Sequence, residues 1–194
     1  MPGLKNKAIN FVLGWLYAKL LPKIKYVTAV SEYAARQLAK MYHVSSRVIY
    51  NGIDLEVFRP CRERPQDGPV FFNVTAYNNL KGRDLLIKYF TRYIARQYPG
   101  SRLIAHGIGI SSNNIVNLES IPDSELPRTY CQATMYLLTS RWESFGLPIL
   151  ESLATGTPVI ALDRDDARRE LILRSARGSS SGTGVPCSRP SGRS

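Results

Sequence analysis

From about residue 70 onwards, short apolar runs alternate with longer stretches in which apolar residues recur at helical spacing. Strands are expected at 70–76, 101–107, 114–120, 134–140 and 158–162, and helices at 81–100, 122–133, 147–155 and 165–173. The first of these helices is expected to place Leu86, Phe90, Tyr93 and Ile94 on one face, and Asp123 or Ser124 is expected to cap the second. This alternation predicts an α/β fold with a Rossmann-like, doubly wound parallel sheet.

One connection does not suit that fold. Only about six residues separate the strand that ends near Gly107 from the strand that starts near Asn114. A parallel crossover ordinarily needs about a dozen residues or more. Either a helix is missing here, or one of the two segments is not a strand.

The N-terminal part mixes lysines with apolar residues over 4–21, which predicts a basic and loosely amphipathic helix. Such a helix packs on its own domain or lies on a membrane surface, and the first alternative is favoured. A short strand at 25–31, a helix from Ser31 to Lys40 and a second strand that ends in an Asn51-Gly52 turn are expected to follow.

Two segments interrupt this pattern. Residues 59–69 contain three prolines and a glycine and predict a linker. Residues 175–194 contain Ser, Gly, Arg and Pro with little to bury, which predicts a disordered tail.

Charge and composition exclude several classes of protein. The net charge is +11, but residues 1–25 and 168–194 each carry +5, so a basic stripe on the folded body is not indicated and nucleic acid is an unlikely partner. No apolar run reaches about 18 residues and no clean secretory signal is present, which favours the cytoplasm. Cys61, Cys131 and Cys187 are far apart and odd in number, so we expect reduced thiols and neither a disulfide nor a metal site. His43, His106 and Asn73, the last in an N-x-T pattern, are expected to be structural.

The candidate chemistry lies in residues 140–155, where a strand ends at Ser140 and a helix begins at Leu147 with Pro148 in its first turn. Ligands of open α/β sheets bind at the carboxyl ends of strands, where helix N-termini offer backbone N–H groups. We expect the turn Ser144–Leu147 to bind an anionic or hydroxyl-rich ligand, with Gly146 allowing close approach. Glu143 and Glu151 flank the turn, and carboxylates accept hydrogen bonds from sugar hydroxyls. Spacing alone leaves a solvated loop and helix glutamate as an alternative.

The longer string, ESFGLPILESLATGTPVIA at 143–161, resembles the E-x(7)-E signature of retaining glycosyltransferases with the two-domain GT-B fold, most closely glycosyltransferase family 4. Further segments resemble the family in the same order, so the resemblance covers roughly residues 27–172: VTAVSEYAARQLAKMYHV, RVIYNGIDLEVFRP, LKGRDLLIKYF and IPDSELPRTYCQATMYLLTS. It implies that 1–58 is a remnant of the acceptor domain with the inter-domain segment, and that 70–174 is the nucleotide-sugar-binding domain.

The resemblance also implies residue roles. Glu143 would be the catalytic carboxylate at the transferred sugar, and Glu151 would bind ribose hydroxyls. The amides of Ser144, Phe145, Gly146 and Leu147 would hold sugar and diphosphate, while Lys81 would neutralise the diphosphate leaving group. No metal and no cofactor are expected.

The sequence departs from the family pattern at Thr75, where an arginine commonly binds the diphosphate; Arg83 is the nearest substitute. The resemblance also leads us to expect that this sequence contains little of the family's acceptor domain and none of its final helices.

Three hypotheses follow from these observations. The first is a family-4-like hexosyltransferase that moves a hexose from a nucleoside-diphosphate sugar, a UDP- or GDP-sugar, to an unidentified acceptor with retention of configuration. The second is a nucleotide-sugar-binding module without independent catalysis, unless a partner chain supplies the N-terminal domain. The third is a basic peripheral protein for membranes or nucleic acid. A peripheral membrane contact is compatible with the first hypothesis.

Overall fold

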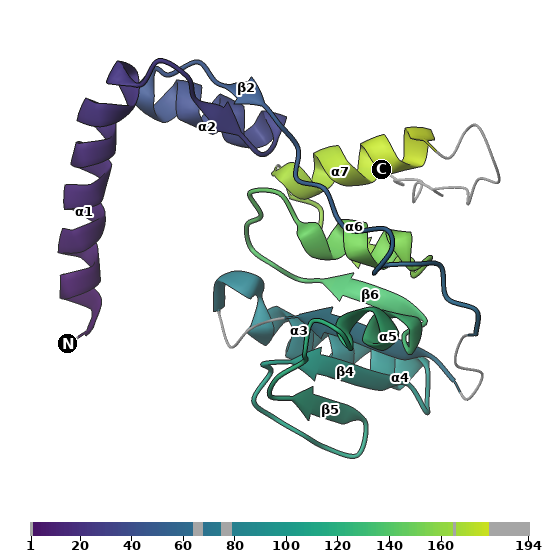
Figure 1. Cartoon of the computed structure of the whole chain (residues 1–194). Coiled ribbons are helices and arrows are strands. Elements are labelled where there is room, and N and C mark those ends of the chain that lie inside the picture. The colour runs from purple at the N-terminus through teal and green to yellow at the C-terminus, as the bar shows by residue number, and fades with distance from the viewer. Residues whose placement is uncertain (1, 64–67, 75–78, 165, 179–194) are drawn as a thin grey trace, which may run out of the picture. The chain divides into compact units, whose positions relative to one another are not determined.

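The structure is a computed structural model that describes residues 2–63, 68–74, 79–164 and 166–178. The chain divides into two compact units, Met1–Asn51 and Gly52–Ser194 (Figure 1). Residues 179–194, which contain most of the predicted disordered tail together with Cys187, lie outside the described residues.

The first unit contains two helices and two short strands: α1 (Pro2–Leu20), a 3₁₀ turn (Leu21–Lys23), β1 (Thr28–Ala29), α2 (Glu32–Tyr42) and β2 (Arg47–Val48). The strands pair in parallel, with Thr28 opposite Arg47. The predicted cap of α2 is confirmed, because the backbone N–H of Ala34 donates to Ser31 Oγ at 3.0 Å. The strands are shorter than predicted, and β2 ends at Val48 without extending to Asn51.

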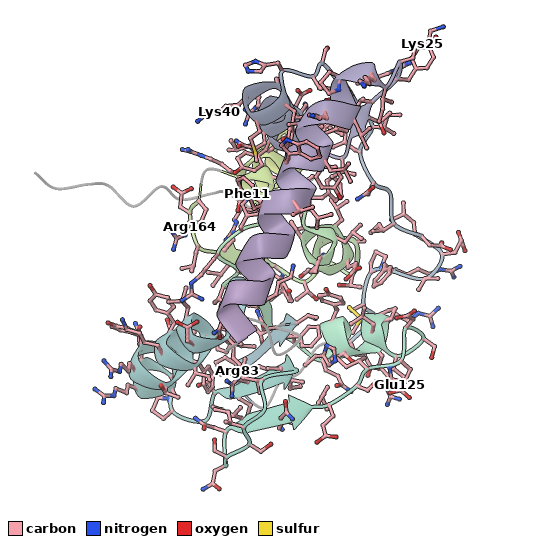
Figure 2. The ribbon with its side chains drawn as sticks, turned by 90° about the vertical axis from the view of Figure 1, so that its left-hand side faces the viewer. Phe11, Lys25, Lys40, Arg83, Glu125 and Arg164 are labelled. Atoms are coloured by element: carbon pink, nitrogen blue, oxygen red, sulfur yellow. A yellow bond between two sulfur atoms is a disulfide. The ribbon has the colours of Figure 1, made fainter. Side chains whose placement is uncertain are left out.

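Helix α1 carries many of the exposed apolar side chains of the first unit. Figure 2 labels Phe11 on this helix. Phe11 is 78% exposed and Trp15 is 53% exposed, and the ammonium group of Lys19 lies 4.1 Å from the centre of the Trp15 ring. Across the described ranges, no helix combines the length and the apolar character that a membrane crossing demands.

The second unit is built on a five-stranded parallel sheet in the order β5-β4-β3-β6-β7. Its strands are β3 (Val70–Val74), β4 (Arg102–His106), β5 (Ile115–Leu118), β6 (Met135–Leu138) and β7 (Val159–Ala161). The predicted parallel sheet is therefore confirmed. Because β3 neighbours β4 on one side and β6 on the other, the strand order reverses between β3 and β6, as in doubly wound folds.

Helices cover both faces of this sheet. A helical run begins after a 3₁₀ turn at Asn79–Lys81 and comprises α3 (Arg83–Tyr89), a π-helical turn (Phe90–Ile94) and α4 (Ala95–Gln97); the others are α5 (Leu126–Cys131), α6 (Leu147–Ala154) and α7 (Ala167–Gly178). Two predictions were wrong. The N-cap of α5 is Glu125, which makes no side-chain capping bond, and residues 175–178, predicted to begin the tail, form the end of α7.

The core between the sheet and α3 explains the short connection after β4. Leu86 and Phe90 pack with Phe71 and Leu103 from the sheet, and Ile108 is buried among them. Residues 107–114 return to the start of β5 without a helix, so β4 and β5 are both strands and are parallel. Ile108 supplies apolar contact on the face that a crossover helix would otherwise cover.

The prediction of reduced thiols was wrong for two of the three cysteines. Cys61 and Cys131 form a disulfide across 70 residues of sequence. The backbone N–H of Cys61 also donates to Thr155 O at 3.1 Å, so this part of the predicted linker is bound to the second unit. No local spacing could reveal the pair, since the tertiary fold alone brings Cys61 beside α5. Asn73 is 1% exposed in β3, which confirms its assignment to the core.

Candidate active site

The candidate site lies at the carboxyl ends of β3 and β6. This is the point where the strand order reverses, and ligands of open α/β sheets bind in the crevice at such a point. Lys81 follows β3, and Glu143 follows β6. The fold thus brings two predicted site residues, 62 positions apart in sequence, to one edge of the sheet.

Gly82 joins the Lys81 turn to the end of β6. It adopts a left-handed conformation with φ +71°, and a Cβ placed there would lie 1.9 Å from Thr139 O. The Thr139 hydroxyl donates to Gly82 O at 3.2 Å. Only glycine fits this close backbone approach, which fixes the position from which the Lys81 side chain extends.

Arg141 and Asp84 strengthen the same connection. The Arg141 guanidinium donates to both carboxylate oxygens of Asp84, at 2.7 and 2.6 Å, and to Asn79 O at 2.6 Å. The backbone N–H of Arg141 donates to Leu80 O at 2.7 Å. The hydrogen bonds from Arg141 lower the pKa of Asp84 to about 2. This pair is a link that sequence reasoning missed.

Lys81 and Glu143 form an ion pair at the centre of the site. Lys81 Nζ lies 2.9 Å from Glu143 Oε1, and the two side chains are 35% and 6% exposed. The carboxylate is therefore enclosed by protein, while the ammonium group faces partly towards solvent. Lys81, which was predicted to bind the leaving group, is thus in direct contact with Glu143, which was predicted to contact the sugar.

The backbone of Glu143 is held by a second ion pair that the sequence did not reveal. Asp166 Oδ2 accepts the Glu143 N–H at 3.0 Å and also accepts from Arg168 Nη2 at 2.7 Å. The Asp166 and Arg168 side chains are 2% and 1% exposed. The run DRDDARRE reads as a solvated charged segment, so only the fold shows that one of its pairs is buried.

Gly146 turns the chain into α6. It is the N-cap in a left-handed conformation (φ 104°, ψ 54°), and Pro148 occupies the first turn, as predicted. Phe145 is 3% exposed and anchors the turn in the core, whereas Leu147 is 37% exposed. The positive end of the helix dipole lies here, although Pro148 has no N–H and the Ile149 N–H already donates to Gly146 O at 2.9 Å.

Glu151, on α6, lies among buried phenols. The Tyr130 hydroxyl donates to Glu151 Oε2 at 2.8 Å. Burial raises the pKa of Glu151, an effect that the Tyr130 hydrogen bond opposes and the nearby charge of Asp123 reinforces.

Tyr136, on β6, is a fully buried phenol. Burial raises the pKa of the Tyr136 phenol, and the negative charges of both glutamates raise it further. Both carboxylates are therefore close enough to act on one buried side chain of β6. Arg83, by contrast, donates its Nε to Ile108 O, and Thr75 lies outside the described residues.

Hollows elsewhere on the second unit do not coincide with this site. One of about 670 Å³ lies where β3 and β4 begin, lined by Arg62, Arg102, Arg128 and Cys131. No group of three or more His, Cys, Asp or Glu side chains that could hold a metal ion occurs within the described ranges.

Comparisons with known proteins agree with this architecture. The family model "Glycosyl transferases group 1" matches residues 56–181, and "Glycosyltransferase Family 4" matches residues 1–57. The chain is 33% identical over 159 residues to a D-inositol 3-phosphate glycosyltransferase of Thermobispora bispora, covering 66% of this chain and 37% of that protein.

Two solved structures share the fold. Sucrose-phosphate synthase from Thermosynechococcus elongatus has a TM-score of 0.65 at 20% identity, over 76% of this chain and 43% of that one. TarM has a TM-score of 0.68 at 15% identity, over 81% and 33%. The chain thus spans a little over a third of the length of the first curated relatives that it matches.

Proposed function

The chain belongs to the group 1 glycosyl transferases, and we propose that it binds a UDP- or GDP-sugar between β3 and β6 and transfers the hexose to an acceptor with retention of configuration. In this proposal the carboxyl edge of the sheet is the donor site. The acceptor contacts residues outside this edge.

The observation that carries the proposal is the Lys81–Glu143 ion pair at the switch point of the sheet. A departing nucleoside diphosphate gains negative charge in the transition state, and a preorganised cation stabilises that charge. The Lys81 stem is flexible and its side chain is 35% exposed, so its ammonium group can exchange a carboxylate for a diphosphate. Lys81 would supply this charge without a metal ion.

The remaining roles follow from position around the same edge. Glu143, fixed through Asp166, would accept hydrogen bonds from the transferred sugar and stabilise positive charge at its anomeric carbon. The turn Ser144–Leu147 would place the positive end of the α6 dipole against sugar and diphosphate. Glu151 would accept hydrogen bonds from the ribose hydroxyls.

Two substitutions test the catalytic roles. Glu143→Gln keeps the shape and removes the charge, and we expect transfer to fall by roughly 100-fold or more, with nucleotide affinity changed far less. Lys81→Met is expected to weaken UDP or GDP binding as well as transfer. Glu125→Gln and Lys88→Met, which alter exposed residues of the same unit, serve as matched controls. Equal transfer rates in Glu143→Gln and the unsubstituted chain would remove Glu143 from the mechanism.

A nucleotide-sugar-binding module without its own turnover is the second candidate. The chain spans 37% of the length of a curated relative, and its first compact unit is residues 1–51. Catalysis needs both reactants held together with water excluded. Titration calorimetry with UDP- and GDP-sugars, run beside a transfer assay, separates the candidates: binding without turnover supports this one. Activity restored by a partner chain with an acceptor domain supports the first.

A peripheral membrane contact is also proposed, for α1 alone. Its exposed Phe11 and Trp15 accompany lysines, the combination that suits an anionic lipid surface. Sedimentation with vesicles of anionic lipid is expected to carry the full chain down, and Phe11→Ser with Trp15→Ser is expected to abolish this. Equal sedimentation of both forms would contradict the proposal.

A further inference from the structure

Tyr130 is a buried phenol whose hydroxyl has one hydrogen-bond partner among the described residues, the Glu151 carboxylate. The residue is fully buried, and its hydroxyl donates to Glu151 Oε2 at 2.8 Å. Burial raises the pKa of Tyr130 well above its ordinary value, and the neighbouring Tyr136 and Glu151 raise it further. The phenol therefore stays protonated and remains a hydrogen-bond donor throughout the neutral range.

The Tyr130 ring is fixed by an aromatic cluster. It packs edge-to-face on Phe72 with centroids 5.0 Å apart and on Phe58 at 6.2 Å, and it lies 5.5 Å from the Tyr136 ring at a tilt. Such contacts hold the ring in one orientation, so the position of the phenol oxygen is set before any ligand arrives.

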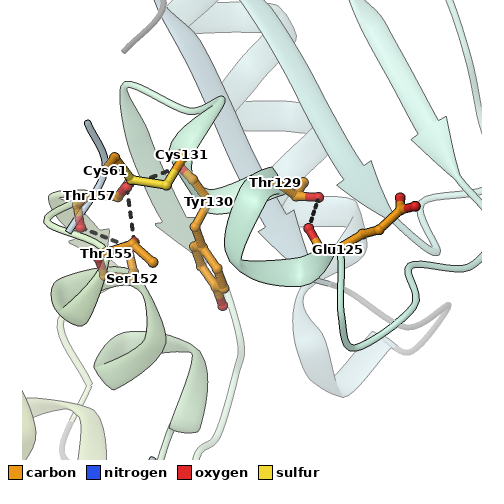
Figure 3. The surroundings of a disulfide bond; sticks show 8 residues. All are labelled: Cys61, Glu125, Thr129, Tyr130, Cys131, Ser152, Thr155 and Thr157. Carbon is orange, nitrogen blue, oxygen red and sulfur yellow. Dashed lines mark hydrogen bonds between the residues drawn. A yellow bond between two sulfur atoms is a disulfide. The ribbon is translucent and has the colours of Figure 1, made fainter. Parts of the chain in front are cut away.

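The backbone of Tyr130 is tied to α6, the helix that carries Glu151. Its carbonyl accepts from the Thr157 hydroxyl at 3.0 Å. Its neighbour Cys131 is linked by the disulfide to Cys61, whose N–H donates to Thr155 O at 3.1 Å (Figure 3). Thr155 and Thr157 directly follow α6. These contacts join α5 to the end of α6, and the hydrogen bond from Tyr130 to Glu151 joins the same two helices a second time.

We propose that Tyr130 is a positioning residue that holds the Glu151 carboxylate ionised and correctly oriented for the ribose of the nucleotide. This inference rests on the proposed function, and it extends the donor site by a residue that does not itself touch the ligand. An isolated carboxylate on α6 could rotate among several rotamers, whereas a fixed phenol donor favours one of them.

The inference predicts a change in pH dependence. Ribose binding requires Glu151 as an acceptor, so affinity falls as pH drops through the pKa of that carboxyl. Besides burial, the groups that shift the pKa of Glu151 are Tyr130 from α5 and Asp123 before α5. Glu151 in turn raises the pKa of the buried Tyr136 of β6. Tyr130 is the one that lowers the pKa, through its hydrogen bond. Removing the hydroxyl raises the pKa, and affinity is then lost at a higher pH.

The test is titration calorimetry of the full chain with UDP and GDP between about pH 5 and pH 8, comparing Tyr130→Phe with the unsubstituted protein. Tyr130→Phe loses a hydrogen bond to a charged group, so we expect its affinity for the nucleotide to be about tenfold weaker at neutral pH. We also expect the loss of affinity on acidification to begin at a higher pH than in the unsubstituted protein. Tyr93→Phe is the control, because it removes a phenol hydroxyl from a residue that is 58% exposed in the π-helical turn, away from both glutamates. Unchanged affinity and an unmoved acid limb in Tyr130→Phe would overturn the inference.

A double-mutant cycle keeps the result specific to Glu151. In a Glu151→Met background, Tyr130→Phe is expected to have little further effect on affinity, since no side-chain oxygen is left there to accept the hydrogen bond. A full effect in that background would mean that Tyr130 acts through packing alone, and would overturn the inference. If the unsubstituted chain binds neither UDP nor GDP, the proposed function fails, and the role of Tyr130 fails with it. If the unsubstituted chain binds and Tyr130→Phe binds equally well, only the role of Tyr130 fails.

Discussion

Replacing Gly82 by alanine should destabilise the second unit far more than replacing a glycine with the same backbone conformation and open surroundings. Gly82 and Gly100 both have positive φ, +71° and +86°. An added Cβ at Gly82 meets Thr139 O at 1.9 Å and its carbonyl carbon at 2.6 Å, whereas at Gly100 it meets nothing within 4 Å. The pair therefore separates backbone conformation from steric overlap.

The expected magnitudes follow from these contacts. A left-handed alanine costs about 1 kcal/mol at either position. At Gly82, relief of the overlap must also move the turn away from β6, which breaks the Thr139 hydroxyl bond to Gly82 O and strains the Arg141 N–H bond to Leu80 O. At about 1 kcal/mol for each bond, Gly82→Ala should cost about 3 kcal/mol and Gly100→Ala about 1 kcal/mol.

Urea unfolding of the full chain, followed by circular dichroism, measures both free energies of unfolding. The m-values of the variants should agree with that of the unsubstituted chain, so that the midpoints report stability. Gly82→Ala should also weaken nucleotide binding, because the Lys81 turn is displaced, and Gly100→Ala should not. If both variants lose the same free energy within about 0.5 kcal/mol, the close approach to Thr139 does not constrain the site.

Three further outcomes are expected. Cys131→Ala removes a disulfide that closes a loop of 70 residues, and the lost constraint on the unfolded chain should lower the free energy of unfolding by up to about 4 kcal/mol. A reductant should cause the same loss in the unsubstituted chain and no further loss in the variant. Asp166→Ala leaves the Arg168 charge buried without its partner and should cost about 3–5 kcal/mol; a smaller loss than that of an exposed Asp163→Ala control would contradict the pairing. The folded-state pKa of Asp84 is lowered to about 2, so the contribution of its carboxylate to the free energy of unfolding is present above about pH 4 and disappears as pH falls towards 2. Asp84→Asn should therefore flatten the acid side of the curve of stability against pH. An unchanged slope would show that the pair with Arg141 does not stabilise the fold.

Much of the fold was accessible from pattern alone because burial imposes periodicity. The strands Val70–Val74 and Met135–Leu138 are runs buried on both faces. Helix α6 has the proline in its first turn and ends near the glycine that the pattern indicated. Residues 107–114 were harder to interpret, because the pattern does not reveal that Ile108 can cover the sheet without a helix.

The candidate site was accessible in part. Lys81 and Glu143 were singled out by resemblance, and their contact at 2.9 Å is a feature of the fold that no spacing encodes. Asp166, Arg168 and Tyr130 were missed, because a charged run and an aromatic residue in a short helix have ordinary explanations until their burial is known.

The amino-acid sequence by itself determined the alternation of strands and helices, and hence the parallel sheet, since side-chain period and turn residues are local properties of the chain. Only the tertiary structure decided which distant groups meet: the Cys61–Cys131 disulfide, the Gly82 contact with β6 and the hydrogen bond from Tyr130 to Glu151. The physical reason is that partners separated by 20 to 70 positions are selected by packing across the sheet edge, which depends on the whole core at once.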